Sequence, residues 1–237
     1  MASAHNRARI DASVGPPEPM LLDTCVVQNI EWVYARHSED REWTSSEEES
    51  LVARYGKPHA NELLALWDLV GAFEEASSTL PWLVSESARE ELNRHPGTKR
   101  ARLVQGWSYW DESADEWGIE AFGTVAPSSL RSGLTNVHPL VLRGLGVSSY
   151  EQIIDSDGPL SEFRDEGDRK IIRDALVCGV RAILTTDLRS FWNERAALDP
   201  YGIEIWRPTD LLVAYESRWQ LERTQRFTGA DAGQSHS

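Results

Sequence analysis

The stretch from Asp168 to Phe191 constrains the fold most, because it joins an amphipathic helix to a short apolar run that ends in an acid. Apolar residues recur at helical spacing after Asp168 and predict one buried helix face, formed by Ile171, Ile172, Ala175 and Leu176. Gly179 is a typical place for such a helix to stop. The run Ala182–Leu184 then predicts a buried strand, and Thr185, Thr186 and Asp187 follow it. A helix followed by a strand with an acid at its carboxyl end indicates a parallel α/β sheet, in which ligands bind beyond the carboxyl ends of the strands.

Two earlier segments repeat the arrangement of a short apolar strand that leads to an acid. Met20–Leu22 is predicted to be a buried strand ending at Asp23, and a helix with one apolar face follows it directly. Thr79–Ser85 is predicted to be another strand, and Ser85–Leu92 after it carries acids on a predicted helix. These acids therefore have similar places at the edge of one parallel sheet.

The segment Ser85–Leu92 contains two candidate glutamates. Ser87 and Glu90 have the spacing of a capping box, so Glu90 has a structural role available at the start of the helix. Glu91 lies about 100° further round the helix and is predicted to face the sheet edge. We prefer Glu91 as the site residue, although the motif alone is ambiguous between Glu90 and Glu91.

One domain is expected over residues 20–215, preceded by a disordered segment 1–19 and followed by a tail 216–237. Residues from about 97 to 160 are irregular and are predicted to form a helical insertion that packs on this domain. Residues 37–50 are predicted to be solvated, and Leu51–Phe73 to be helical with a break near Gly56–Pro58. Ile203–Trp206 is predicted to be the last strand, with Thr209 capping a final helix.

Composition limits the classes of function. The chain has 237 residues and a net charge of −14, which argues against broad, non-specific binding of nucleic acid and requires any basic rim to be local. Its two cysteines, Cys25 and Cys178, lie in apolar surroundings and are expected to be buried free thiols. No apolar run reaches the roughly 20 residues that span a bilayer, and residues 1–15 lack the apolar core of a signal peptide. We therefore expect a cytoplasmic protein that does not enter a membrane.

Four carboxylates are predicted to converge: Asp23, Glu91, Asp168 and Asp187. Four acids in one cleft repel one another, and one of them would take up a proton unless a cation neutralised them. A hard divalent ion with oxygen ligands, Mg²⁺ or Mn²⁺, suits such a site and leaves room for a phosphate. The implied reaction is metal-assisted hydrolysis of a phosphodiester. Asp165, Glu166 and Asp174 also lie near by and are expected to be solvated.

These segments resemble the PIN-domain ribonuclease family. They are L-L-D-T-C-V, S-E-S-A-R-E-E-L, D-R-K-I-I-R-D-A and L-T-T-D-L-R-S-F, with I-E-I-W-R-P-T-D-L-L near the end, and they cover most of residues 20–215 in order. The resemblance implies a three-layer α/β/α fold with a central, mainly parallel sheet, a Mg²⁺ or Mn²⁺ site, and endonuclease activity on single-stranded RNA. It carries Asp23, Glu91, Asp168 and Asp187 over as the acidic site, with Thr185 bonding within the site and orienting Asp187. The span from Glu91 to Asp168 is longer than in the compact toxin members, so the resemblance leaves open whether an antitoxin partner exists or the chain forms a homodimer.

Basic residues near the acids are candidate phosphate contacts. Arg169, Lys170 and Arg189 flank the acids directly, and Lys99, Arg100 and Arg102 open the insertion. A rival hypothesis is a catalytically silent binding module of the same fold that acts through a protein partner, and metal titration would separate the two. A nucleotide-binding α/β protein is disfavoured, because neither G-x-G-x-x-G nor G-x-x-x-x-G-K-[ST] follows a predicted strand.

Overall fold

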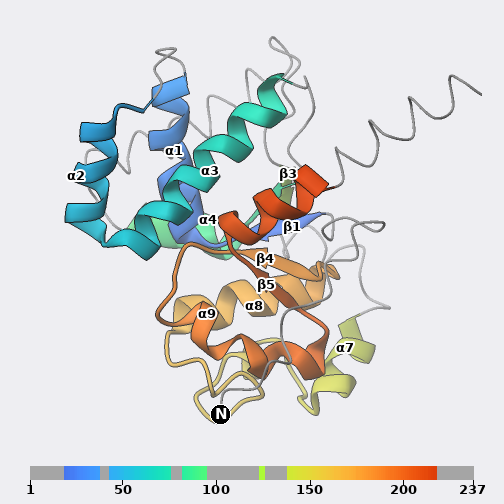
Figure 1. Ribbon diagram of the computed structural model, residues 1–237. Helices are drawn as coiled ribbons and strands as arrows, with labels where there is room; N and C mark the ends of the chain where they lie inside the picture. The colour runs from blue at the N-terminus through green and yellow to red at the C-terminus, as the bar shows by residue number, and fades with distance from the viewer. Residues whose placement is uncertain (1–18, 38–42, 76–81, 95–122, 126–137, 218–237) are drawn as a thin grey trace, which may run out of the picture.

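The computed structural model describes residues 19–37, 43–75, 82–94, 123–125 and 138–217 (Figure 1). The predictions for the leading segment 1–18, the tail from 218 onward, and Lys99, Arg100 and Arg102 lie outside these residues. Within the described ranges, no helix has the length and apolar character that crossing a bilayer requires.

The core of the fold is a parallel sheet. It comprises β1 (Met20–Leu22), β2 (Trp82–Ser85), β3 (Gly123–Val125), β4 (Ala182–Leu184) and β5 (Glu204–Trp206), in the spatial order β3-β2-β1-β4-β5. Every neighbouring pair is parallel, and Leu22 of β1 lies beside Val84 of β2 and Leu184 of β4. The chain order runs outward in opposite directions from β1 and β4, so the topological switch point lies between these two strands. In open parallel sheets, the crevice beyond the carboxyl ends at this point is the usual place for a ligand.

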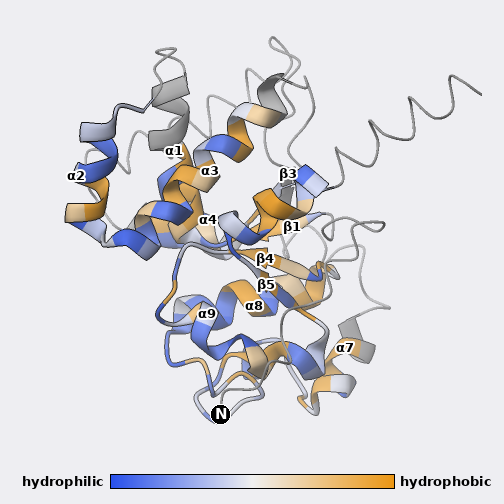
Figure 2. Cartoon of the chain, in the orientation of Figure 1, coloured by the Kyte–Doolittle hydropathy of each residue, from blue (hydrophilic) through white to orange (hydrophobic). Residues whose placement is uncertain are grey.

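Helices cover both faces of the sheet (Figures 1 and 2). On one face, Met20, Leu22 and Leu184 pack with residues of α1 (Thr24–His37), α3 (Lys57–Glu75) and the helix 208–217. On the other, Leu21 and Ile183 pack with residues of α8 (Glu166–Cys178), α7 (His138–Leu145) and α9 (Phe191–Glu194). Because consecutive strand residues face opposite ways, β1 and β4 are apolar on both faces and read as continuous buried runs. The predicted α/β architecture with a parallel sheet is confirmed.

The helix boundaries agree with the prediction in some places and correct it in others. The break before Lys57 is confirmed, because α2 (Ser45–Tyr55) ends at Gly56, whose φ of 81° suits glycine. Residues 44–50 are mostly exposed, as predicted for the segment 37–50, and α2 begins among them behind a capping box of Thr44 and Glu47. Gly179 ends α8 in the left-handed conformation, as predicted.

Two predicted caps are wrong. Ser85, not Ser87, accepts the hydrogen bond from the N–H of Ala88 at 3.0 Å and caps α4 (Glu86–Arg94). Thr209 lies inside the last helix, and its N–H and hydroxyl both donate to the buried carboxylate of Glu62. In both cases, the side chain that accepts from the free N–H groups of the first helical turn is not the one that the local sequence pattern suggested.

The predicted helical insertion is only partly helical where it is described. Residues 138–160 contain α7 and the 3-10 helix η2 (Glu151–Ile153). However, β3 extends the sheet next to β2, with Thr124 in register with Val84. The insertion therefore contributes a strand to the main sheet, which the sequence analysis did not predict.

Candidate functional site

Asp23 lies at the carboxyl end of β1, beside the switch point. Its N–H donates to the carbonyl of Leu184 at 3.0 Å, which extends the pairing of β1 with β4 by one residue. The side chain is 5% exposed, and its Oδ2 accepts hydrogen bonds from the Thr185 hydroxyl at 2.6 Å and the Cys25 thiol at 2.8 Å. Asp23 is therefore held in place by a donor from the first turn of α1 and by one that directly follows β4.

The surroundings of Asp23 favour its protonated form. The pKa of Asp23 is raised to about 6, chiefly by burial and to a smaller extent by the charges of Asp187 and Glu91, while the bonds from Cys25 and Thr185 oppose the shift. Desolvation disfavours a carboxylate, and like charges add to that penalty. Asp187 and Glu91 are thus close enough to Asp23 to act on it, as the predicted convergence requires.

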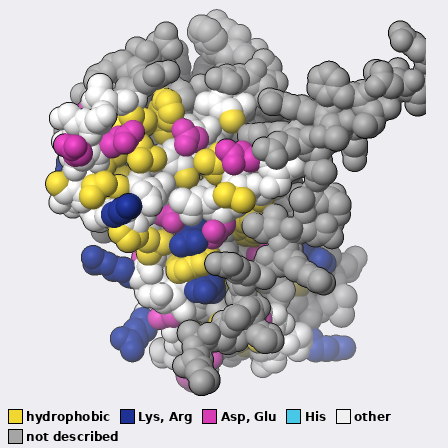
Figure 3. Space-filling model, in the orientation of Figure 1, with side chains coloured by type: hydrophobic (Ala, Val, Ile, Leu, Met, Phe, Trp, Pro, Cys, Tyr) yellow, Lys and Arg dark blue, Asp and Glu magenta, His cyan; other side chains and the backbone are white. Residues whose placement is uncertain are grey.

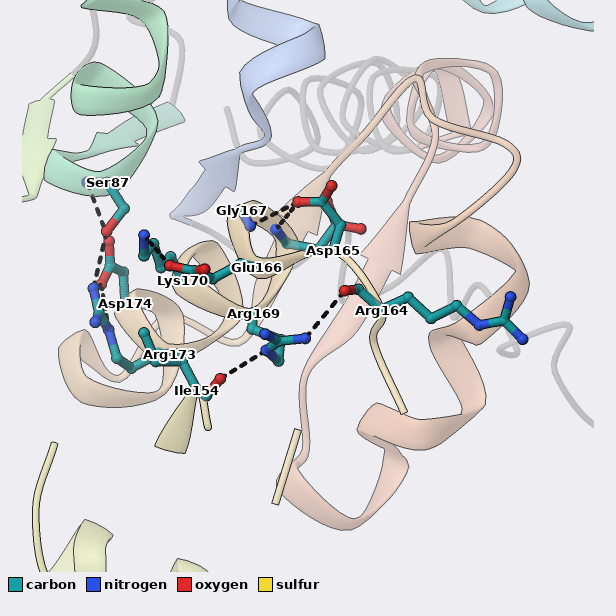
Figure 4. Close-up of polar contacts among 11 residues, drawn as sticks. Ser87, Ile154, Arg164, Asp165, Glu166, Gly167, Arg169, Lys170, Arg173 and Asp174 are labelled. Atoms are coloured by element: carbon teal, nitrogen blue, oxygen red, sulfur yellow. Dashed lines mark hydrogen bonds and ion pairs between the residues drawn. The ribbon is translucent and has the colours of Figure 1, made fainter. Parts of the chain in front are cut away.

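Asp168 lies in the first turn of α8. Asp165, the N-cap of this helix, accepts from the N–H groups of Gly167 and Asp168, so it serves the helix start (Figure 4). The Oδ2 of Asp168 is buried and has no hydrogen-bond partner among the described residues. The pKa of Asp168 is raised to about 7, chiefly by burial and then by the charge of Asp23; a hydrogen bond with Ser190 opposes the shift, and the charges of Asp165 and Asp187 add smaller effects in the raising direction. An unpartnered buried carboxylate oxygen is uncommon and indicates a missing ligand or proton.

Asp187 follows β4 in a turn that it also stabilises. Its N–H donates to the Thr185 hydroxyl at 2.9 Å, and its Oδ1 accepts from the N–H of Arg189 at 2.7 Å. Its Oδ2 accepts from the Ser190 hydroxyl. Thr185 thus bonds to the backbone of Asp187 and to the carboxylate of Asp23, which is the kind of contact within the site that the sequence analysis expected.

The geometry distinguishes Glu91 from Glu90. The Oε2 of Glu91 accepts from the Thr24 hydroxyl at 2.8 Å, so this side chain reaches from α4 to the start of α1. A Cβ placed on Gly167 of α8 would lie 3.1 Å from the same oxygen. Glu90 is exposed. Of the two glutamates, Glu91 is the one beside Asp23 and the start of α8.

The four acids share one region, but they do not form a closed set of ligands. Within the described residues, no three His, Cys, Asp or Glu side chains are gathered so as to hold a metal ion together. The donors are all carboxylate oxygens, which suits a hard cation such as Mg²⁺ or Mn²⁺. The unpartnered oxygen of Asp168 and the raised pKa values of Asp23 and Asp168 also fit a site that favours a positive charge.

The predicted phosphate contacts have different surroundings. Arg169 donates through Nε to the carbonyl of Ile154 at 2.8 Å and through a terminal nitrogen to that of Phe163 at 2.7 Å (Figure 4). This guanidinium therefore ties the loop before α8 to the helix, and its predicted contact with a phosphate stays a prediction. Lys170 pairs with Glu166 at 2.5 Å one helical turn away, and Arg189 is exposed.

Of the three acids near Asp168 that were expected to be solvated, Asp165 and Glu166 are exposed, but Asp174 is not. It is fully buried, and its Oδ1 accepts from the Tyr150 hydroxyl at 2.8 Å and from Arg173 at 3.0 Å. Arg173 also donates to the Ser87 hydroxyl at 3.0 Å (Figure 4) and lies over the ring of Tyr150. This network links α8, which carries Asp168, to α4, which carries Glu91, and to the segment before η2.

Sequence reasoning missed several polar residues of the site, namely Thr24, Cys25, Asn29, Thr186 and Ser190. Thr24 directly follows Asp23 and Thr186 directly follows Thr185, so the positions of these two threonines in the chain were a usable signal. Ser190 and Asn29 lie further along the chain, where the sequence gives no reason to expect a bond from Ser190 to Asp187 or from Asn29 to Thr186.

Comparison of the chain with protein-family models, with curated proteins and with solved structures finds no match. The class that the structure itself defines is a parallel α/β protein with acidic side chains near its switch point, two of which have raised pKa values.

Proposed function

We propose that the chain is a metal-dependent endoribonuclease that hydrolyses phosphodiester bonds of single-stranded RNA. The observation that supports the proposal is that Asp23 and Asp168 have raised pKa values, through burial and through like charge from neighbours that include Asp187 and, for Asp23, Glu91. The resemblance of the surrounding segments to PIN-domain ribonucleases supports the same reading. That resemblance also motivates a role as the toxin of a toxin–antitoxin pair, with an antitoxin protein as partner.

The four acids would have two roles, binding the metal ion and completing or orienting its ligand shell. Asp23 and Asp168 would hold a Mg²⁺ or Mn²⁺ ion, with Glu91 and Asp187 completing or orienting the shell. Such an ion supplies an activated water and neutralises charge on the phosphate oxygens. Thr185 and Cys25 hold the Asp23 carboxylate, and Ser190 holds that of Asp187, so these two acids are already fixed before any ligand binds.

The distribution of cations fits a local basic rim on an acidic protein. On the face shown in Figure 3, acidic side chains gather over the upper part, where α2 and α3 lie, and Lys and Arg over the lower part. Next to the Asp187 turn, Arg195 and Arg207 both stack on Trp192 at 4.1 Å from its ring centre. Arg207 is matched by Asp210 at 2.8 Å, so the exposed Arg189 is the better candidate for a phosphate.

The test is Mn²⁺ binding and cleavage by the full chain. We expect Asp168→Asn and Glu91→Gln to reduce Mn²⁺-dependent cleavage of a labelled single-stranded RNA by at least about 100-fold, because even partners that only orient metal ligands contribute about 10- to 100-fold. Glu90→Gln is the matched control on the same helix and should stay within about twofold of the unmodified chain. Far-ultraviolet circular dichroism would check that each variant folds.

A catalytically silent binding module is the second candidate. It is favoured by the hydrogen bonds that already occupy Glu91 and Asp187, and by the absence of three gathered ligands among the described residues. Calorimetric titration distinguishes the two, since a silent module should release no heat with Mn²⁺. Unchanged cleavage in both Asp168→Asn and Glu91→Gln would remove the proposed mechanism even if Mn²⁺ bound.

A further inference from the structure

A continuous chain of hydrogen bonds ends on the Asp23 carboxylate. The amide nitrogen of Asn29 donates to the Thr186 hydroxyl at 3.0 Å, and this hydroxyl donates to the sulfur of Cys25 at 3.1 Å. The Cys25 thiol then donates to Oδ2 of Asp23 at 2.8 Å. The same oxygen accepts from Thr185, whose hydroxyl in turn accepts from the N–H of Asp187.

The direction of each bond is fixed by the number of hydrogens available. A hydroxyl or a thiol has one hydrogen to donate, and a carboxylate can only accept. Because the hydrogen of Cys25 goes to Asp23, its sulfur accepts from the hydroxyl and, at 3.4 Å, from the N–H of Thr186. Thr186 must then accept from Asn29. All the dipoles therefore point toward one oxygen of Asp23, and bonds in such chains strengthen one another.

The second cysteine shows that these contacts are not a general property of a half-buried thiol. Cys178 packs against the core cluster on the α8 face and forms no hydrogen bond among the described residues. Cys25 is bonded to Asp23 and Thr186 and lies 3.5 Å from the Thr185 hydroxyl. Its sulfur thus occupies a polar position, which packing alone does not require.

We propose that Cys25 is a positioning residue for the metal site, holding Oδ2 of Asp23 through a relay that begins at Asn29. This inference rests on the proposed function, because Asp23 is the group whose orientation matters. With Oδ2 bonded by Cys25 and Thr185, the carboxylate cannot rotate without breaking both bonds, so its other oxygen is presented in one direction. Partners that orient a metal ligand commonly change metal affinity by about 10- to 100-fold.

Calorimetric Mn²⁺ titration of the full chain tests the relay. Cys25→Ala should weaken Mn²⁺ binding about tenfold, and Cys25→Ser, which keeps a donor, should recover affinity to within about threefold. Asn29→Ala and Thr186→Val, which interrupt the relay further from Asp23, should weaken binding by about two- to fivefold. Cys178→Ala is the matched control and should bind as the unmodified chain does. Melting temperatures recorded in parallel separate a loss of affinity from a loss of fold.

Infrared spectroscopy gives a readout that does not depend on metal binding. The S–H stretching band of Cys25, identified by its loss in Cys25→Ser, should lie at lower frequency than that of Cys178 because it donates to a carboxylate. Asp23→Asn should shift only the Cys25 band. An unshifted band would overturn the inference.

The outcomes separate the inference from the function on which it rests. No Mn²⁺ binding by the unmodified chain would refute the proposed function. Normal binding by the unmodified chain and by Cys25→Ala would overturn the positioning role alone. If Cys25→Ala does not fold, unchanged affinity in both Asn29→Ala and Thr186→Val would overturn it.

Discussion

At the scale of single residues, Asp23 and Asp168 are carboxyl groups whose surroundings favour the protonated form. Their pKa values of about 6 and about 7 lie above the ordinary value of 3.8. Between pH values near 4 and near 7, the folded chain therefore binds more protons than the unfolded chain. Stability contributed by these groups is present at low pH and is lost as the pH rises through about 6 to 7. The ionised carboxylates therefore destabilise the fold most near neutral pH, where a bound cation would offset their charge.

This linkage predicts how stability depends on pH without metal. In the presence of a chelator, the melting temperature of the unmodified chain should fall relative to that of Asp168→Asn between about pH 4 and 7 and then level off. The difference should be about 2 to 4 °C, corresponding to roughly 1 kcal/mol after allowance for solvent screening at a partly exposed group. Differential scanning calorimetry at several pH values measures it. Parallel curves for the two proteins would show that Asp168 is ionised throughout.

Several site residues could be predicted because the sequence next to them is enough to indicate their position in the fold. Asp23 and Asp187 follow from apolar runs that end in an acid, and the structure places them directly after β1 and in the turn after β4. Cys25 could not be recognised, because its partner Thr186 is 161 positions away and only the fold joins them. The role of Arg169 was missed for a related reason, since backbone carbonyls that accept its hydrogen bonds leave no mark in the sequence.

At the scale of elements, the start of α8 is placed close to α4. Gly167, in the first turn of α8, donates its N–H to Asp165 at 2.6 Å. A Cβ at this position would lie 2.9 Å from Asp165 Oδ1 and 3.1 Å from Glu91 Oε2. Both atoms are ends of flexible side chains and can move. A substitution here should therefore displace Glu91 more than it destabilises the fold.

Gly167→Ala is the corresponding prediction. Alanine in a helix usually stabilises by about 0.5–1 kcal/mol relative to glycine, and here the two close contacts should offset that gain. We expect a melting temperature within about 2 °C of the unmodified chain but Mn²⁺ affinity about fivefold weaker. Gly144→Ala in α7 is the control, because its Cβ would meet nothing within 4 Å. Equal Mn²⁺ affinity in both variants would contradict a role for Glu91 at the site.

Helix starts show where element-level prediction fails. The Ser87 and Glu90 spacing matched a capping box, yet Ser85 caps α4 and Ser87 instead accepts from Arg173. For the last helix, Glu62 of α3 accepts from Thr209 in place of a local cap. A sequence motif indicates that some side chain can satisfy the helix start, but tertiary contacts decide which one does.

At the scale of the whole molecule, the order of the strands could not be read from the sequence. The strands have three or four residues each, and the apolar runs of β1 and β4 carry no information about their neighbours. The strand β3 was missed because Gly123–Val125 is too short to show alternation and lies in an otherwise irregular segment. Parallel pairing nevertheless followed from the helix between successive strands, because parallel strands require a long crossover.

The position of α4 against α8 depends on one buried carboxylate from outside the acidic region. Asp174 is fully buried in α8, accepts from Tyr150 and Arg173, and also accepts from the N–H of Ser87 in α4 at 3.4 Å. Removing one member of a buried ion pair leaves the other unpaired and commonly destabilises by about 3–5 kcal/mol. Because α4 carries Glu91 and α8 carries Asp168, a loss of this link should also separate two of the candidate ligands.

Asp174→Ala should therefore reduce both stability and metal binding. We expect the melting temperature to fall by about 6–12 °C, since roughly 3 kcal/mol is lost in a chain of this size. Tyr150→Phe, which removes one hydrogen bond and keeps the ring over Arg173, should lower the stability by only about 1 kcal/mol. Asp199→Asn, at an exposed aspartate, is the control for a change of charge alone. If Asp174→Ala retained the Mn²⁺ affinity of the unmodified chain well below its melting temperature, the α4–α8 link would matter for folding and not for the site. Weaker binding at a temperature where the variant is fully folded would show that the buried network holds Glu91 on α4 and Asp168 on α8 in the positions that metal binding needs.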